Sequence, residues 1–247
     1  MRQYDLLIIG GGILGTFHAW SAVEKGLKVA IVDKGGQPRG SSVQNFGQVV
    51  PSGMDLKWQQ YGRKSLEIYK SIQQQFDISV RQNGSVYIAS NEEEVTLLEE
   101  LAAINRNNDY ASQMLTAQQC LDRYEGLRSD YCKAGLFFPE EVTVEPRVAL
   151  YRIQQFMQAQ KGVDFFYKTL AIDVQTKGEG CVVTTSDLRL LEASQVLICN
   201  GYEFQTLFPE IYAQSDLQTV KLQMLLTVPQ PTQQLPGSVL TGLTIRR

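Results

Sequence analysis

Residues 4–34 read YDLLIIGGGILGTFHAWSAVEKGLKVAIVDK. The run at residues 4–10 is short, continuous and apolar, which is typical of a strand buried on both faces of a parallel sheet. Apolar residues then recur at helical spacing over residues 14–25, and Gly26 suits the end of a helix. A second apolar run at residues 28–34 predicts another buried strand. The order strand, helix, strand indicates half of a Rossmann unit in an α/β fold.

The glycine loop between the first strand and the helix fits the pattern GxGxxG. Gly10 permits a tight turn, Gly12 lets a pyrophosphate approach the backbone, and Gly15 allows the helix to pack closely on the strand. Ile13 and Leu14 lie at the N-terminus of the helix, where backbone N–H groups and the helix dipole attract a phosphate. A glycine-rich turn without a ligand is the alternative, but the flanking strand and helix favour a nucleotide site.

An acidic residue, Asp33, ends the second strand and is followed by Lys34. A carboxylate at this position accepts hydrogen bonds from the ribose hydroxyls of an adenosine, and Lys34 is included in the predicted binding site. The same carboxylate repels a 2′-phosphate, which disfavours NADP. An exposed charge or a loop cap is the alternative for Asp33. The position of the acid does not distinguish FAD from NAD.

The loop that begins at Ser41 reads SSVQNFGQVVPSG. Ser41, Ser42 and Gly47 belong to a set of small residues that allow backbone donors to wrap around a cofactor. Asn45 and Gln48 carry amides that can bond to a polar edge of such a ligand. A surface loop that uses the same residues for turn formation is equally consistent with this stretch. Local chemistry therefore leaves both interpretations open.

The composition is that of an ordinary globular protein with 247 residues, of which 43% are hydrophobic and 20% charged. A net charge of -3 provides no general field for nucleic acid, which is not expected as a partner. The four cysteines form no CxxC pair and His18 is the single histidine, so no metal site is predicted. No apolar run is long enough to span a bilayer, which predicts a cytoplasmic protein without an integral membrane segment.

The pattern beyond the first loop predicts two interleaved domains. Residues 1–77 and 144–215 are assigned to the nucleotide-binding domain, because a helix near residue 146 leads into strands that rejoin the first sheet. Residues 78–143 and 216–247 are assigned to a substrate domain. Within the last range, residues 217–228 read LQTVKLQMLLTV and are predicted to form a long strand.

Five motifs follow one another in an order that resembles the D-amino-acid-oxidase-like (DAO) superfamily of FAD-dependent oxidoreductases. They are GGGILG, VDK, SSVQNFGQVVPSG, VTVEPRVALYRIQQF and VLICNGYEFQTLFPE. The chain most closely resembles a bacterial branch with an Asn-Phe-Gly loop that is linked to aminophosphonate metabolism. The resemblance implies FAD as cofactor. It also implies a Rossmann-like FAD/NAD(P)-binding domain of the glutathione-reductase type, interleaved with an α+β substrate domain built on a mainly antiparallel sheet.

The resemblance also implies roles for particular residues. The loop from Ser41 to Gln48 is expected to run along the FAD pyrophosphate toward the flavin. The strand near Ala171 is expected to offer its backbone to the adenine, and Asn200 and Gly201 to lie beside the dinucleotide. The residues themselves support only a close backbone approach at Gly201.

Two polar side chains on the predicted late strand are catalytic candidates. Lys221 and Gln223 resemble the part of the substrate sheet that approaches the flavin in this family. Strand alternation would place both on one face and Met224 on the other. An ordinary exposed lysine and glutamine on a sheet are the alternative.

The implied reaction is oxidation of the C–N bond of a small amine or amino acid, with hydride transfer to the flavin and hydrolysis of the imine. An aminophosphonate or a secondary amine is the implied substrate class, and the electron acceptor, oxygen or a quinone, is left open. Members of the family normally continue past the position of Arg247 with a segment that covers the flavin. The sequence therefore keeps a truncated and catalytically inactive nucleotide-binding fragment as an alternative. An NAD-dependent dehydrogenase that uses the same glycine loop is a further alternative.

Overall fold

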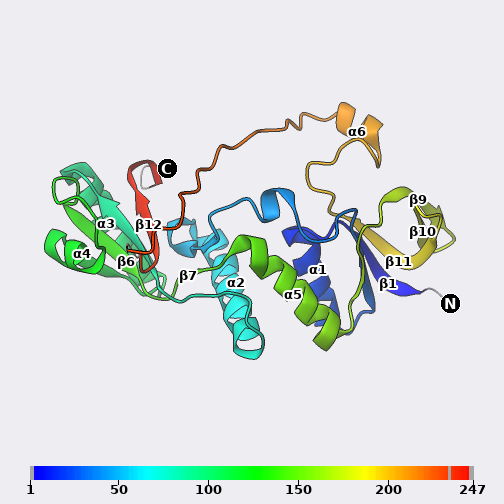
Figure 1. The fold of residues 1–247 in the computed structure, drawn as a ribbon, viewed down its shortest axis with the longest axis horizontal. Coiled ribbons are helices and arrows are strands. Elements are labelled where there is room, and N and C mark those ends of the chain that lie inside the picture. The colour runs from blue at the N-terminus through cyan, green and yellow to red at the C-terminus, as the bar shows by residue number, and fades with distance from the viewer. Residues whose placement is uncertain (1–2, 233–234, 245–247) are drawn as a thin grey trace. The chain divides into compact units, whose positions relative to one another are not determined.

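The computed structural model describes residues 3–232 and 235–244 of the chain. These residues fold into two compact units whose chain ranges interleave, as the colours of Figure 1 allow the reader to follow. Unit 1 comprises Met1–Asn45 and Pro146–Met224, and unit 2 comprises Phe46–Glu145 and Leu225–Arg247.

The first boundary between the units falls after Asn45, well before the expected position at residue 77. The reason is helix α2 (Leu56–Gln75), which packs against the turn η2 (Pro51–Gly53) of unit 2. At Gly62 of this helix, a Cβ would lie 3.1 Å from Cγ of Pro51, so helix and turn are in close contact. An apolar stripe on a helix predicts that this face is buried, but it does not show which neighbouring element covers the face.

Unit 1 is built on a six-stranded sheet with the order β8-β2-β1-β11-β10-β9. The first four strands of that order run parallel, and β10 and β9 continue antiparallel. The strands are β1 (Tyr4–Ile9), β2 (Val29–Val32), β8 (Asp164–Phe166), β9 (Ala171–Lys177), β10 (Gly180–Thr185) and β11 (Leu190–Ile198). The helices are α1 (Ile13–Val23), α5 (Pro146–Lys161), the short α6 (Pro209–Ala213) and the 3-10 turn η1 (Gly40–Ser42). This arrangement confirms the predicted Rossmann-like sheet.

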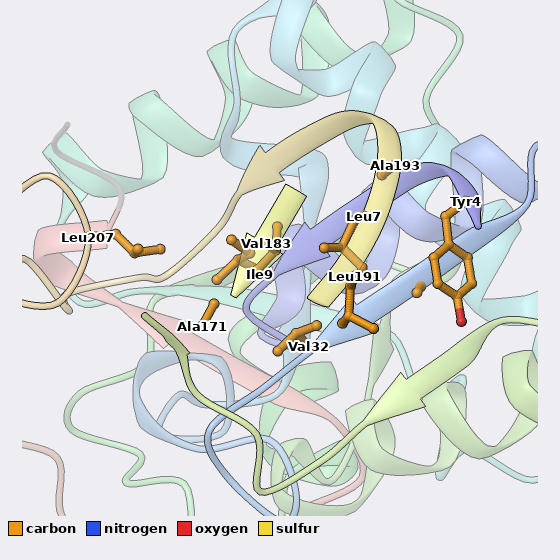
Figure 2. Packing of buried hydrophobic residues seen from close by; sticks show 10 residues of the cluster. Tyr4, Leu7, Ile9, Val32, Ala171, Val183, Leu191, Ala193 and Leu207 are labelled. Carbon is orange, nitrogen blue, oxygen red and sulfur yellow. The ribbon is translucent and has the colours of Figure 1, made fainter. Parts of the chain in front are cut away.

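Strand β1 is buried on both of its faces, as its unbroken apolar run predicts. Leu7 and Ile9 belong to the cluster in Figure 2, where they pack with residues such as Val183. Ile8 points to the other face of the sheet, toward helix α1. Its Cγ2 is so close to this helix that a Cβ at Gly15 would lie only 3.1 Å from it. The central strand is thus fixed from both sides, which holds its carboxyl end in one place.

Unit 2 is built on a four-stranded sheet with the order β12-β4-β6-β5, in which only β12 and β4 run parallel. Its strands are β4 (Ser85–Ala89), β5 (Gln113–Thr116), β6 (Ala134–Phe138), β12 (Ser238–Thr241) and the separate pair β3 (Gln48–Val49) and β7 (Val142–Thr143). The remaining helices are α3 (Glu92–Asn107), α4 (Ala117–Arg123) and the turn η3 (Gly242–Thr244). The mainly antiparallel sheet agrees with the expected α+β domain. Among the helices of the described chain, none is both long enough and apolar enough to cross a bilayer.

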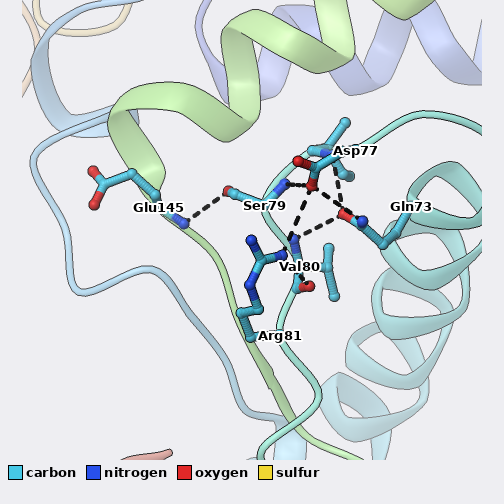
Figure 3. A network of polar contacts seen from close by, with 7 residues as sticks. Gln73, Asp77, Ser79, Val80, Arg81 and Glu145 are labelled. Carbon is cyan, nitrogen blue, oxygen red and sulfur yellow. Dashed lines mark hydrogen bonds and ion pairs between the residues drawn. The ribbon is translucent and has the colours of Figure 1, made fainter. Parts of the chain in front are cut away.

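A polar network links the C-terminal end of α2 to Glu145, the last residue of the first range of unit 2 (Figure 3). Gln73 Oε1 accepts the backbone N–H of Val80 at 2.9 Å, and Asp77 Oδ1 accepts that of Ser79 at 2.9 Å. Ser79 has a φ of 66°, a left-handed conformation that these bonds support. Its hydroxyl accepts the N–H of Glu145 at 3.0 Å, so the residue directly before α5 is anchored within unit 2.

The prediction of a long strand at residues 217–228 was wrong. This segment is extended, but it pairs with no strand in the described part of the chain, and its apolar side chains face solvent. Leu222 is 81% and Leu225 96% exposed. An alternating pattern suits a strand only where a neighbouring edge supplies hydrogen bonds and a covered face, and the pattern itself supplies neither.

Candidate functional site

A cavity of about 480 Å³ opens in unit 1 at the carboxyl end of the parallel strands. Its walls come from the residues that follow β1, β2 and β11, three strands that are neighbours in the sheet. The chain passes from β1 to β2 on one side, whereas β11 pairs on the other side of β1. The cavity therefore lies at the point where the strand order reverses, which is where open α/β sheets bind their ligands.

The cavity brings together most of the residues that the sequence predicted for the cofactor. The predicted residues in its wall are Gly10, Gly12, Asp33, Lys34, Ser41, Ser42, Ala171, Asn200 and Gly201. They come from five separate stretches of the sequence. Their convergence on one cavity is expected of a binding site and is not required of a glycine-rich turn that merely connects a strand to a helix.

The glycine loop has no room for side chains at its two critical positions. Gly10 has a φ of 108°, and a Cβ there would lie 2.6 Å from the carbonyl carbon of Cys199. A Cβ at Gly15 would overlap the carbonyl oxygen of Gly10, which confirms close packing of helix on loop. Gly12 faces the cavity, where a Cβ would lie 3.0 Å from Oγ of Ser42. The backbone is consequently exposed to a ligand at the strand-to-helix turn.

The N-terminus of helix α1 faces this turn, and its own cap residue offers no side-chain hydrogen bond. Gly12 occupies the cap position, and no acidic residue lies in the first turn of the helix. Ser42 Oγ accepts the N–H of Ile13 at 3.0 Å, which brings the loop after β2 to the helix end. A helix N-terminus in this setting stabilises a phosphate through its N–H groups and its dipole.

Asn45 stabilises the loop from within rather than lining the cavity. Its Nδ2 donates to the carbonyl oxygens of Ser41 at 3.2 Å and of Ser42 at 3.0 Å. The amide thereby holds both serines, which do line the cavity, at the end of η1. A direct contact between Asn45 and a cofactor stays a prediction.

Asp33 fixes two turns at once with its carboxylate. Oδ2 accepts the N–H of Gly11 at 2.6 Å, and Oδ1 accepts the N–H of Gly35 at 2.6 Å. A carboxylate has about four lone-pair sites, so each oxygen keeps one for a ribose hydroxyl. The acid thus holds the glycine loop in shape and presents acceptors at the cavity wall.

A buried glutamine that was not among the predicted residues holds the glycine loop through hydrogen bonds. Gln154 of α5 is fully buried, and its Nε2 donates to the carbonyl oxygen of Gly11 at 2.6 Å and to Thr16 Oγ1 at 2.9 Å. The hydroxyl of Tyr167 donates to Gln154 Oε1 at 2.9 Å. A lone glutamine on an apolar helix face is the only sequence signal for this bridge. The contact across 143 residues is not visible without the fold.

Replacing Gln154 by leucine is expected to lower the free energy of unfolding by about 2 kcal/mol. The leucine would fill a similar volume, but it would leave the Gly11 carbonyl and the Tyr167 hydroxyl without their buried partner. Urea unfolding followed by circular dichroism measures the change. Gln155→Leu, at the exposed neighbouring position of the same helix, is the control and is expected to stay within about 0.5 kcal/mol. Equal losses in the two variants would contradict the supporting role of Gln154.

A second residue that was not predicted, Glu203, lines the cavity. Glu203 forms an ion pair with Lys34, and both residues line the cavity. The Lys34 ammonium lowers the pKa of the Glu203 carboxyl below its usual value. Tyr202 also lines the cavity. Its ring lies close to the backbone of Gly40, where a Cβ would be only 2.9 Å from the ring. The quoted motif that contains Asn200 also contains Glu203, but nothing in the sequence indicates its partner.

The remaining predicted residues stand apart from the cavity wall. Ile13 and Leu14 begin helix α1, and neither is among the described residues that line the cavity, so their contact with a phosphate stays a prediction. Gly47 and Gln48 belong to unit 2, where Gln48 of β3 pairs with Thr143. Their contact with a cofactor stays a prediction.

The two catalytic candidates from the late segment also stand apart. Lys221 and Gln223 lie in the exposed stretch that does not form the predicted strand, and neither is among the described residues that line the cavity. The face that strand alternation assigned to them does not exist in this structure. Their catalytic role stays a prediction without support from the fold.

Comparison with known proteins identifies the chain's relatives. It is 23% identical over 252 residues to one of the subunits of opine oxidase from Rhizobium meliloti, a match that covers 92% of this chain and 64% of that protein. It is 22% identical over 257 residues to D-amino acid dehydrogenase of Vibrio cholerae, covering 80% of this chain and 60% of that protein. The chain thus spans between 60% and 64% of the length of these two relatives.

A solved structure has the same fold. An L-amino acid deaminase from Proteus vulgaris that lacks its specific insertion sequence superposes with a TM-score of 0.76 and 21% identity, over 97% of this chain and 64% of that chain. The family model described as FAD dependent oxidoreductase (DAO) matches residues 5–244. Because this match spans nearly the whole sequence and agrees with the cavity and the sheet order, the chain belongs to the FAD dependent oxidoreductase family.

Proposed function

We propose that the chain is the FAD-binding part of an oxidoreductase that oxidises the C–N bond of a small amine or amino acid. Unit 1 holds the ADP part of FAD in its cavity, and unit 2 contributes to the substrate domain. The observation that carries the proposal is the convergence of a helix N-terminus with glycine at its cap position and an acidic strand end on one cavity. Those are the two groups that a dinucleotide needs, one for the pyrophosphate and one for the ribose.

FAD is the cofactor of this family, and the residues present fit its ADP half. The backbone from Gly10 to Gly12 leaves the space that a Cβ would fill, and Ser42 adds a hydroxyl beside it. Asp33 offers acceptors for ribose hydroxyls, and the buried start of β9 at Ala171 offers backbone for the adenine. A cavity of this size falls within the range of about 300–1,000 Å³ that is usual for small-molecule sites.

The flavin ring supplies hydride acceptance in this class of enzyme, and water then hydrolyses the imine product. The protein's part is to bind the dinucleotide and to orient a neutral amine, so the absence of an obvious base among the predicted residues does not oppose the proposal. The relatives' names point to amino acids as substrates. The finer proposal is an aminophosphonate, for which the support is the resemblance carried by the Asn-Phe-Gly loop at residues 45–47.

The proposal predicts that an amine substrate bleaches bound flavin in the absence of oxygen. The purified chain is loaded with FAD, made anaerobic, and mixed in turn with glycine, D-alanine, L-proline, an opine and 2-aminoethylphosphonate. At least one of these is expected to remove the visible absorbance band of the oxidised flavin. This readout requires no external acceptor, so it does not depend on whether oxygen or a quinone reoxidises the flavin.

Bleaching by the aminophosphonate and not by the amino acids would favour the finer assignment. The matched control is lactate, which carries a hydroxyl in place of the amine and is expected to leave the band unchanged. If FAD binds but no amine bleaches it, the chain is a nucleotide-binding fragment and the proposed activity is wrong.

A further inference from the structure

The ion pair between Lys34 and Glu203 joins two walls of the cavity that lie far apart in sequence. Lys34 follows Asp33 at the end of β2, whereas Glu203 follows β11. Both side chains line the cavity, and the carboxylate is the less exposed partner, at 24% against 56% for the lysine. The Glu203 carboxylate therefore compensates the charge of Lys34, the residue next to Asp33 in the sequence.

The Glu203 carboxylate is held in position independently of the lysine. Its Oε1 accepts the backbone N–H of Gln205 at 3.1 Å, which leaves Oε2 for Lys34. Asn200 donates its amide to the carbonyl oxygen of Glu203, and the hydroxyl of Tyr212 donates to Asn200 Oδ1 at 3.3 Å. A carboxylate fixed in this way meets the lysine with little further loss of conformational freedom.

Four charged residues of the described chain line the cavity wall. Asp33, Lys34 and Glu203 lie together and sum to one negative charge. Arg39 also lines the cavity, but it belongs to the turn that leads to Ser42 at the N-terminus of α1. The segment that leads to the helix N-terminus therefore contributes a cation to the wall, whereas the three charges of Asp33, Lys34 and Glu203 are negative overall.

We propose that Glu203 makes this site selective for an adenosine with a free 2′-hydroxyl, because it neutralises the one cation beside Asp33 among the described residues of the cavity wall. A lysine next to the ribose would otherwise attract a 2′-phosphate, in the way that basic residues accommodate NADP in related nucleotide sites. Discrimination between similar ligands commonly depends on such a repulsive element in addition to attractive contacts. The inference rests on the proposed FAD site and adds the group that excludes 2′-phosphorylated nucleotides from it.

The test uses two probes that differ by a single phosphate, ADP and 2′-phospho-ADP, titrated calorimetrically into the flavin-free chain. The wild-type chain is expected to bind ADP at least about tenfold more tightly. Glu203→Gln is expected to reduce that ratio by about three- to tenfold, mainly because 2′-phospho-ADP binds more tightly. Raising the salt concentration is expected to shrink the difference between the two proteins, since the effect is electrostatic.

Two further variants separate charge from structure. Lys34→Met combined with Glu203→Gln is expected to remove the gain in 2′-phospho-ADP affinity, a result that a structural role of Glu203 would not produce. Glu210→Gln is the matched control, because Glu210 is an exposed acid of α6 outside the cavity wall, and its ratio is expected to equal that of the wild type.

An unchanged ratio in Glu203→Gln, or an equal loss of affinity for both probes, would overturn the inference and leave the FAD site standing. If the wild-type chain bound neither probe, the nucleotide site itself would be wrong, and the inference with it. If 2′-phospho-ADP bound the wild-type chain as tightly as ADP, Glu203 would not exclude the phosphate.

Discussion

Replacing Gly10 by alanine is expected to raise the dissociation constant for FAD by at least about 100-fold. The new Cβ would overlap the Cys199 carbonyl group. Neither can rotate away, because the carbonyl belongs to the backbone and the position of a Cβ is fixed by the backbone to which it is attached. A φ of 108° adds strain for any residue with a side chain. Relief of the overlap requires β1 and the segment after β11 to separate at the cavity, and this separation would distort the turn that faces the pyrophosphate.

Quenching of flavin fluorescence measures the FAD affinity of this variant, and thermal unfolding measures its stability. Gly178→Ala is the matched control. Gly178 also has a positive φ, of 61°, but a Cβ there would meet nothing within 4 Å. The control is expected to lose about 1 kcal/mol of stability and to keep its FAD affinity. FAD binding by Gly10→Ala at the wild-type level would show that the turn at Gly10 does not contact the cofactor.

Asp33→Asn is expected to raise the dissociation constant for FAD by about 30- to 100-fold. The acid accepts one backbone N–H on each oxygen, from Gly11 and Gly35. An asparagine amide keeps one acceptor and places its NH₂ group against the other N–H, so one turn is released. It also removes the charge that strengthens each bond to a ribose hydroxyl.

The matched control for this variant is Asp5→Asn. Asp5 Oδ2 accepts the backbone N–H of Lys28 at 2.8 Å, a bond of the same kind at the opposite end of the same two strands. Asp5→Asn is expected to leave FAD affinity within about twofold of the wild type. A loss of affinity in Asp5→Asn as large as in Asp33→Asn would mean that the effect comes from the fold and not from the cavity.

The parts of the fold that local sequence determines were predicted correctly. The buried strands at both ends of residues 4–34 need only an apolar run, and the glycine loop needs only its pattern and its neighbours. The cavity confirms that Gly10, Gly12 and Asp33 lie together. These residues are close in sequence or at the ends of adjacent strands, so their proximity follows from the Rossmann topology.

The parts that depend on distant partners were not predictable from the residues. Glu203 reaches Lys34 only because the sheet order brings the ends of β11 and β2 together. Gln154 reaches Gly11 only because helix α5 packs beside α1. The pattern at residues 217–228 suited a strand, yet the strand is not formed because no neighbouring edge pairs with it in the described chain. A periodic pattern describes one element, whereas a contact is a property of two.

Competition between ADP and FAD for the 247-residue chain tests the central claim most directly. If the cavity of unit 1 holds the ADP half of the cofactor, ADP is expected to displace FAD with a stoichiometry of one, and FMN, which lacks the adenosine, is expected not to compete. Displacement of FAD by FMN but not by ADP, or the failure of both ADP and FAD to bind, would contradict the assignment of this cavity.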